Sequence, residues 1–108
     1  MSLRAKDHSI SLHCIDDAMS LIGSGMDGCL FTPDDIASDF FDLKNGLAGE
    51  VFQKLVNYRF PVAFIIPSDH PYGDRVTELI RDHKQHPVIR FFQSEEDGID
   101  WLKQQSNS

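Results

Sequence analysis

A run of apolar residues without a polar interruption, Pro-Val-Ala-Phe-Ile-Ile at 61–66, is the feature that most restricts the folds open to this chain. A strand that is apolar at every residue needs cover on both faces of its sheet, which is typical of parallel strands flanked by helices. Similar short apolar stretches occur at 28–31 and 87–92. Each is followed by a helical pattern, so we predict that the three strands are neighbours, in sequential order, in one parallel sheet.

Between these strands the apolar residues recur at helical spacing. We expect an early helix at 15–22 and a short helix that begins with Thr32 as N-cap and Pro33 at the first helical position. Longer helices are expected at 47–58, at 74–83 and after Ser94. A further strand is expected within residues 1–13. The predicted fold is therefore α/β, with a four-stranded, mainly parallel sheet and helical crossovers.

The length of the chain, 108 residues, is typical of a single domain. We expect one α/β domain over residues 1–108, with a disordered polar tail at 104–108. Two cysteines are too few for a disulfide scaffold. The apolar residues around Cys14 and Cys29 predict two buried thiols.

The acidic composition argues against two classes of partner. Lys and Arg number 10 against 17 Asp and Glu, which gives a formal net charge of −7. Nucleic acids and anionic membrane surfaces both recruit proteins through basic residues. The sequence also has no recognisable signal peptide in residues 1–12 and no apolar run long enough to span a bilayer. We expect a cytoplasmic protein that binds neither nucleic acid nor membrane.

One segment that mixes aromatic and polar residues is unusual enough to suggest a family. It reads Phe40-Phe41-Asp42-Leu43-Lys44-Asn45-Gly46-Leu47-Ala48-Gly49-Glu50, continued by Gln53-Lys54 and Asn57-Tyr58-Arg59. This motif resembles the signature of the bacterial domain-of-unknown-function family 4180, and the resemblance extends over residues 15–102. It implies no activity, because none is established for that family.

The layout also resembles, more weakly, the small regulatory domains named for sulfate transporters and anti-sigma-factor antagonists. In those domains a strand leads to an Asp-Ser-Ser-Gly-Leu loop, and a serine at the helix start is phosphorylated. Asn45 stands at the matching place in this chain, and an amide cannot accept phosphate. The resemblance implies the anti-sigma-factor-antagonist fold and a docking surface at this helix start, without the phosphorylation switch.

The same segment is the predicted working surface, and we expect it to bind another protein. Gly46 and Gly49 would let a partner approach the backbone closely, and the helix start offers free N–H groups. Glycine in a helix costs up to about 1 kcal/mol relative to alanine, so two glycines near a helix start need a reason. The predicted binding residues are Phe40, Phe41, Asp42, Lys44, Asn45, Gly46, Gly49, Glu50, Lys54 and Tyr58.

A structural interpretation of this segment remains open. Phe40, Phe41 and Leu43 would then fill the core, and Asn45 would be the N-cap of the helix. Gly49 would pack tightly against the sheet of its own chain. In that case the polar residues of the helix form only a solvated face.

The sequence favours a non-catalytic regulatory or protein-interaction module over an enzyme. The alternative is a small enzyme or ligand-binding protein with a polar site at Glu50, Lys54, Tyr58 and His70. No nucleophile elbow, phosphate loop or dinucleotide motif supports catalysis. A homodimer stays open as a second kind of partner.

Two histidines have a spacing that metal sites also use. His83 and His86 form a His-x-x-His pair, and His70 follows a strand, where parallel folds bind ligands. A structural zinc site needs four ligands and a catalytic one three, and no further ligand stands at suitable spacing. His83 and His86 also fall at a helix C-terminus, where positive side chains are favoured. We therefore predict no metal site and no cofactor.

Overall fold

The central sheet has the predicted parallel order. In the computed structural model, β1 (Cys29–Phe31), β2 (Val62–Ile65) and β3 (Ile89–Phe92) form a parallel sheet in the order β1-β2-β3. The central strand β2 is buried along its whole length, as its uninterrupted apolar sequence predicts. The structure describes residues 4–5, 11–12, 14–25, 27–36, 40, 46–67, 70 and 73–106.

The predicted fourth strand is not confirmed. Arg4 forms one isolated parallel bridge with Leu30, on the edge of β1 that β2 does not occupy, and Leu12 forms another with Ile36. Most of residues 1–13 lie outside the described residues. A single bridge provides no ladder of hydrogen bonds, so the described part of the chain has a sheet of three strands.

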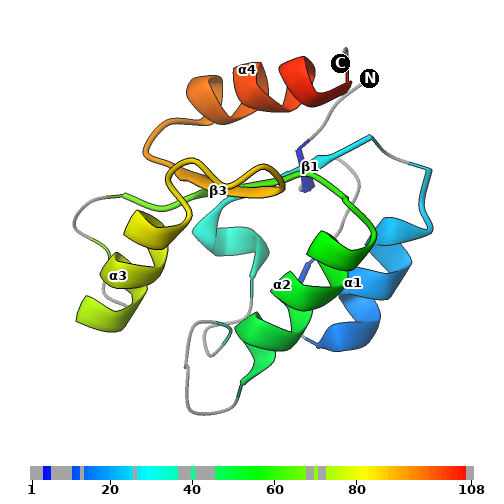
Figure 1. Cartoon of the computed structure of the whole chain (residues 1–108), viewed down its shortest axis with the longest axis horizontal. Coiled ribbons are helices and arrows are strands. Elements are labelled where there is room, and N and C mark those ends of the chain that lie inside the picture. The colour runs from blue at the N-terminus through cyan, green and yellow to red at the C-terminus, as the bar shows by residue number, and fades with distance from the viewer. Residues whose placement is uncertain are drawn as a thin grey trace.

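Helices cover both faces of the sheet (Figure 1). Helices α1 (Ile15–Ile22), α2 (Leu47–Asn57) and α3 (Asp74–Asp82) lie on one face, and α4 (Glu95–Ser106) lies on the other. The short helix is the 3₁₀ helix η2 (Pro33–Asp35), and its N-cap is Thr32 as predicted. The Thr32 amide and hydroxyl both donate to Oδ2 of Asp35, each at 2.9 Å.

Helix α4 extends into the tail that the sequence predicts to be disordered. Its last three residues, Gln104, Gln105 and Ser106, are helical. Residues 107–108 lie outside the described residues. Trp101 and Leu102 anchor this end of the helix on the sheet, and the backbone can therefore continue its helical hydrogen bonds beyond them.

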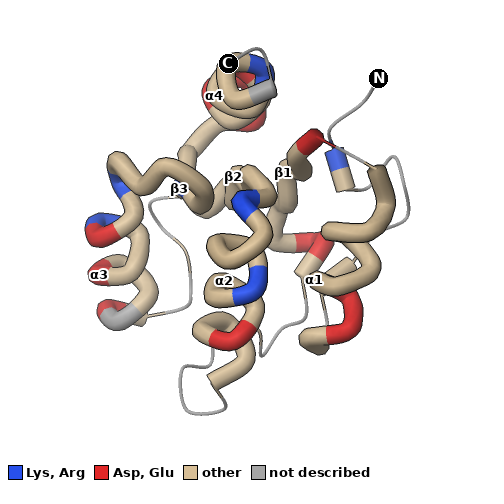
Figure 2. The backbone as a smooth tube through the Cα atoms, turned by 45° about the vertical axis from the view of Figure 1, so that its right-hand side comes forward, with Lys and Arg blue, Asp and Glu red and all other residues tan. Residues whose placement is uncertain are grey.

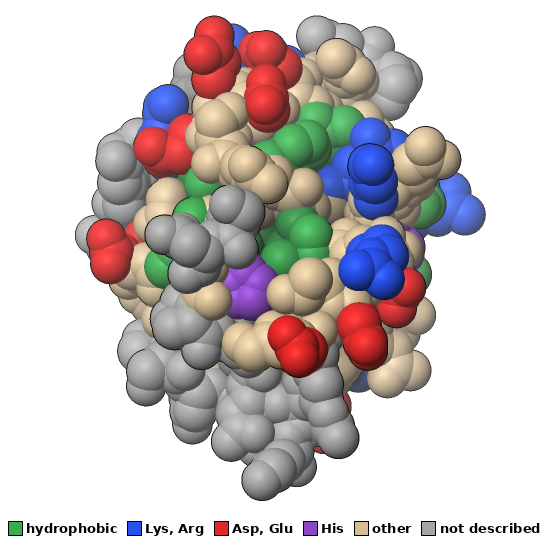
Figure 3. Space-filling model, turned by 90° about the vertical axis from the view of Figure 1, so that its left-hand side faces the viewer, with side chains coloured by type: hydrophobic (Ala, Val, Ile, Leu, Met, Phe, Trp, Pro, Cys, Tyr) green, Lys and Arg blue, Asp and Glu red, His purple; other side chains and the backbone are tan. Residues whose placement is uncertain are grey.

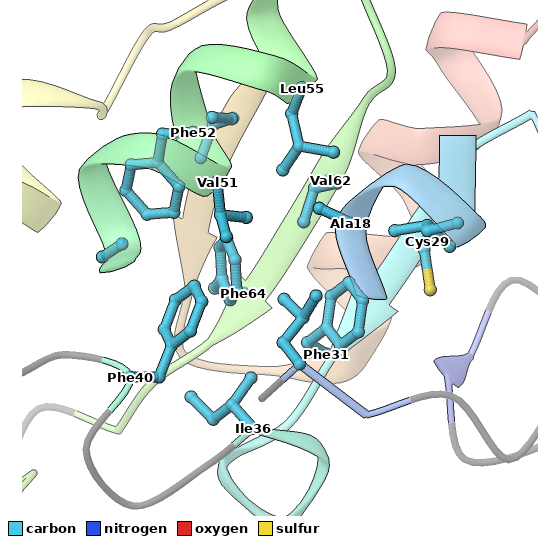
Figure 4. Close-up of a cluster of buried hydrophobic side chains, with 14 of the residues drawn as sticks. Ala18, Cys29, Phe31, Ile36, Phe40, Val51, Phe52, Leu55, Val62 and Phe64 are labelled. Atoms are coloured by element: carbon cyan, nitrogen blue, oxygen red, sulfur yellow. The ribbon is translucent and has the colours of Figure 1, made fainter. Parts of the chain in front are cut away.

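The face of the sheet that α1, α2 and α3 cover holds an aromatic core (Figure 4). The parallel register aligns Phe31, Phe64 and Phe91 in one row across the three strands. The ring centroid of Phe64 lies 5.7 Å from that of Phe31 and 5.3 Å from that of Phe91. Phe52 of α2 adds a fourth ring, 5.5 Å from Phe64. Phe64 is therefore the centre of this core.

The opposite face of the sheet holds a second, smaller cluster of buried side chains. Leu30, Ala63 and Ile65 pack there against Trp101 and Leu102 of α4. Helix α4 approaches the sheet at Gly98. A Cβ atom added to Gly98 would lie 2.9 Å from Cδ1 of Ile65, 3.0 Å from Cδ1 of Leu30 and 3.4 Å from Cβ of Ala63. Glycine is thus needed at this position for the helix to pack this closely.

The two cysteines differ, contrary to the prediction that both are buried. Cys29 is buried in β1, and burial raises the pKa of its thiol to about 12, with Asp35 adding to the effect. Cys14 is exposed because it is the N-cap of α1. Its amide donates to Oδ2 of Asp17 at 3.2 Å, and its Sγ lies 3.7 Å from the same oxygen.

Candidate functional site

Helix α2 carries most of the predicted binding residues that the structure describes. Its N-cap is Gly46, with φ of 71°, a left-handed conformation that glycine adopts without strain. The alternative in which Asn45 is the N-cap is therefore wrong. Asn45 itself lies outside the described residues, as do Phe41, Asp42 and Lys44.

One face of α2 is buried and the other is exposed. Ala48, Val51, Phe52 and Leu55 are buried against the sheet and α1, as the amphipathic pattern predicts. The predicted binding residues Gly46, Gly49, Glu50, Lys54 and Tyr58 are exposed, together with Gln53, Val56, Asn57 and Arg59. We call these nine exposed residues the α2 outer face. Figure 2 shows that charges of both signs follow this helix.

Phe40 does not belong to this surface. Its side chain is fully buried, with its ring centroid 6.2 Å from Phe52 and 6.0 Å from Phe64. Phe40 therefore fills the core, as the structural interpretation expects, and its side chain has no exposed surface for a partner to contact. Its ring lies beside the rings of Phe52 and Phe64, on the face of the sheet that α2 covers (Figure 4).

Gly49 has no packing role among the described residues. A Cβ atom added there would meet no atom within 4 Å. The alternative in which Gly49 packs tightly on its own sheet is therefore wrong. Alanine would be accommodated at this exposed helical position and would favour the helix.

The C-terminal end of α2 holds an unusual residue. Phe60 N–H donates to the carbonyl of Leu55 at 2.9 Å, and Arg59 N–H donates to that of Val56 at 3.0 Å. These two bonds form a Schellman motif, in which glycine is the usual residue at the left-handed position. Here that position is Arg59, with φ of 52°. A residue with a side chain costs roughly 1–2 kcal/mol in this conformation.

The side chains of the α2 outer face have few partners within the chain. Glu50 and Lys54 have the predicted i, i+4 spacing, yet no ion pair joins them, and neither side chain forms a hydrogen bond with a described residue. Tyr58 has an exposed fraction of 59%, and Val56 one of 38%. These groups remain available to a second molecule.

The four residues of the alternative enzyme site, Glu50, Lys54, Tyr58 and His70, lie in two separate places in the structure. His70 lines a pocket of about 320 Å³ at the carboxyl ends of β2 and β3, beside α3. None of Glu50, Lys54 and Tyr58 lines that pocket. They are spread over an exposed helix surface instead, so the structure does not assemble these four residues into one site.

Sequence reasoning missed most of the residues that line the pocket. Thr77, Ile80, Arg81 and Lys84 are spaced i, i+3, i+4 and i+7, which places them on one face of α3 and its extension. This spacing could have indicated the site, because these four residues lie on one face of the helix that connects two predicted parallel strands. The rest of the lining comes from the strand ends, which are distant in sequence.

His83 and His86 have structural roles. His83 Nδ1 lies 2.8 Å from the carbonyl of Leu79, at the C-terminus of α3. His86 Nδ1 accepts hydrogen bonds from the amides of Val88 and Ile89, both at 3.1 Å, just before β3. Burial lowers the pKa of His86, and His83 and Arg90 lower it further. Within the part of the chain that is described, no three His, Cys, Asp or Glu residues gather as metal ligands would.

Comparison with known proteins identifies one family. A family model described as "Domain of unknown function (DUF4180)" matches residues 3–102. No curated protein and no solved structure matches the chain. The weaker resemblance to anti-sigma-factor antagonists is not confirmed by these comparisons. No helix in the described residues has the length and apolar character needed to cross a membrane.

Proposed function

Since the chain belongs to the DUF4180 family of domains of unknown function, we propose a function from its geometry: a non-catalytic module that binds another protein through the α2 outer face. The surface extends from Gly46 to Arg59 along one exposed helix. It is separate from the aromatic core that keeps the helix in place.

One observation carries this proposal: α2 has two exposed residues that oppose its own stability. Gly49 is a helical glycine, and no atom of the described residues would lie within 4 Å of a Cβ atom there. Arg59 occupies a left-handed position that glycine would favour. Alanine in place of Gly49, or glycine in place of Arg59, would stabilise the isolated chain. Residues that lower stability on a surface are typical of functional sites, where another requirement offsets the cost.

The chemistry of the surface favours a protein as the partner. Glu50 lies one helical turn before Lys54, so a nucleic-acid backbone that follows this helix would meet a carboxylate beside Lys54. Tyr58 offers a large amphipathic side chain, a type that is enriched at the centres of protein interfaces. Gly49 allows a partner backbone to come close to the helix. We expect this partner in the cytoplasm.

Binding explains this surface better than catalysis. A general acid or base acts best in a pocket that excludes water and alters its titration. Glu50, Lys54 and Tyr58 are exposed on a helix instead. This supports the non-catalytic interpretation of the segment.

The test uses two variants of this surface and one matched control variant. Glu50→Ala and Tyr58→Ala change the α2 outer face, and Glu96→Ala changes an exposed acid in the first turn of α4. The partner is captured from native cytosol with the wild-type chain and purified, and its affinity is then measured calorimetrically. We expect Tyr58→Ala to weaken binding about tenfold or more. All three variants should keep their free energy of unfolding within about 0.5 kcal/mol.

Two results would contradict the proposal. One is an affinity that Glu50→Ala and Tyr58→Ala leave unchanged, or that Glu96→Ala weakens equally. The other is a homodimer, detected by analytical ultracentrifugation, that Tyr58→Ala dissociates. That result would make a second copy of this chain the occupant of the surface.

A further inference from the structure

We propose that the pocket at the carboxyl ends of β2 and β3 binds a small organic anion. Its acidic group would lie against Arg81 and Lys84, and its apolar body would contact Ile80 and Phe91. This site is on α3, apart from the α2 outer face, and the inference goes beyond the proposed protein binding. The proposal rests on the position, the lining and the charge of the pocket.

The position of the pocket is one where parallel α/β folds bind ligands. Ile66 and Pro67 follow β2 directly, while Phe92 and Gln93 mark the end of β3. Ligands of open parallel sheets bind outside the carboxyl ends of the strands. The volume of about 320 Å³ is at the low end of the range for small-molecule sites, roughly 300–1,000 Å³. It suits a compact molecule with one ring or one branched chain.

The floor of the pocket is apolar and is held by the core. Ile66, Ile80 and Phe91, which all pack in the core on the α3 face of the sheet, contribute the apolar side chains. The Phe91 ring stacks on Phe64, at an interplanar angle of 22°. Ile66 N–H donates to the carbonyl of Phe92 at 2.9 Å, which joins the two strand ends below the pocket. Because these contacts exist before any ligand binds, the floor is preorganised for an apolar body.

One edge of the pocket is polar and ordered. The Thr77 hydroxyl donates to the carbonyl of Gly73 at 3.4 Å and lies 3.1 Å from Nε2 of His70. Arg81 and Lys84 follow Thr77 on the same helical face. A guanidinium group at this edge can hold a carboxylate or phosphate through two parallel hydrogen bonds.

The charge of the lining is opposite to that of the whole protein. The chain has a formal net charge of −7. Among the described residues, the lining nevertheless contains Arg81, Lys84 and His70 and no acidic residue. Neither Arg81 nor Lys84 forms an ion pair with a described residue. Figure 3 shows the α3 side of the molecule, where hydrophobic side chains lie exposed beside a group of Lys and Arg.

The dipole of α3 explains only part of this arrangement. Basic side chains are favoured near any helix C-terminus, which accounts for Arg81 and Lys84 as residue types. It does not account for their place beside an open apolar hollow. A cationic edge next to an apolar floor matches a molecule that is acidic at one end and apolar at the other.

Phenyl phosphate and 3-phenylpropionate are suitable probes, because each joins one ring to one acidic group. Their uncharged counterpart is 3-phenylpropanol, and inorganic phosphate lacks the apolar body. Each is titrated into ¹⁵N-labelled full chain, and amide chemical shifts are followed. We expect the two anionic probes to shift the amides of α3 and of the residues after β2 and β3. The alcohol and inorganic phosphate should bind at least about tenfold more weakly.

Two variants test the cationic edge, with a control on another helix. Arg81→Gln and Lys84→Gln should each weaken phenyl phosphate about three- to tenfold, and Lys103→Gln on α4 should not change it. The α2 variants Glu50→Ala and Tyr58→Ala should also leave phenyl phosphate binding unchanged. The proposal is wrong if neither anionic probe shifts these amides at millimolar concentration, if the alcohol binds as well as the anions, or if Lys103→Gln matches the α3 variants.

Discussion

Helices α2 and α4 each contain an interior glycine, and the two glycines have different surroundings. Gly98 of α4 faces the sheet, and a Cβ atom there would lie 2.9 Å from Ile65. Gly49 of α2 is exposed, and a Cβ atom there would meet no described residue within 4 Å. In sequence both are single glycines inside amphipathic helices. Only the first has an explanation within its own chain.

The comparison teaches that a helical glycine indicates function only after packing has been examined. The close contact of α4 with Leu30, Ala63 and Ile65 accounts for Gly98 completely. Gly49 lacks such a contact in the described part of the chain and still carries the conformational cost of glycine. The residue that the fold does not need is the one that supports a binding surface.

The largest effect is expected for Gly98→Ala, which should lower the free energy of unfolding by about 1–2 kcal/mol. The added methyl group must displace Cδ1 of Ile65 and of Leu30, and the gain in helix propensity offsets only part of this cost. Chemical denaturation measures the change. In a double-mutant cycle, Ile65→Val removes the clashing Cδ1 atom, so the two substitutions together should cost less than the sum of each alone. Strict additivity would show that this contact is not the cause.

The opposite sign is expected for Gly49→Ala, which should raise the free energy of unfolding by up to about 1 kcal/mol. For a domain of this size, this corresponds to a melting temperature higher by roughly 4–8 °C per kcal/mol. The same variant should weaken capture of the partner, because its methyl group occupies the space where the partner backbone approaches. A variant that is more stable and binds equally well would remove Gly49 from the proposed interface. A loss of stability would mean that Gly49 does have a packing role.

A smaller gain, about 0.5 kcal/mol, is expected for Arg59→Gly. Relief of the left-handed strain at Arg59 stabilises the folded state, and the greater freedom of glycine in the unfolded state offsets part of it. Thermal denaturation of Arg59→Gly beside Arg59→Ala separates the two contributions, because alanine removes the side chain and keeps the strain. If Arg59→Ala stabilises the chain equally, the side chain rather than the backbone is responsible.

The order of elements could be predicted from the sequence because it depends on local patterns. The apolar run at 61–66 has the composition of a strand covered on both faces, and the structure has β2 at the centre of the sheet. The apolar stripe of α2 similarly predicts its four buried residues, although it also contains Val56 and Tyr58, which are exposed. Thr32 could be assigned as an N-cap because its capping partner, Asp35, lies three residues away. These features need information from only a few neighbouring residues.

The candidate sites could be predicted only in part. The exposed positions of Glu50 and Lys54 follow from the helical period of α2. By the same period Tyr58 falls on the apolar stripe with Val51 and Leu55, yet it is the C-cap of the helix and is exposed. Phe40 was assigned to the surface because it stands in a polar motif, yet its neighbours in space are the rings of Phe52 and Phe64. The fourth strand was expected from the ambiguous residues 1–13, where short apolar stretches give weak signals.

By itself, the sequence determined the parallel α/β arrangement, the amphipathic helices and the net negative charge, because each depends on local composition or spacing. Only the tertiary structure decided that Gly98 is packed and Gly49 is open, since this depends on which helix face meets the sheet. It also decided that Arg81 and Lys84 share a pocket with Ile66 and Phe92. Those residues belong to separate elements, and parallel pairing of β2 with β3 brings their ends together.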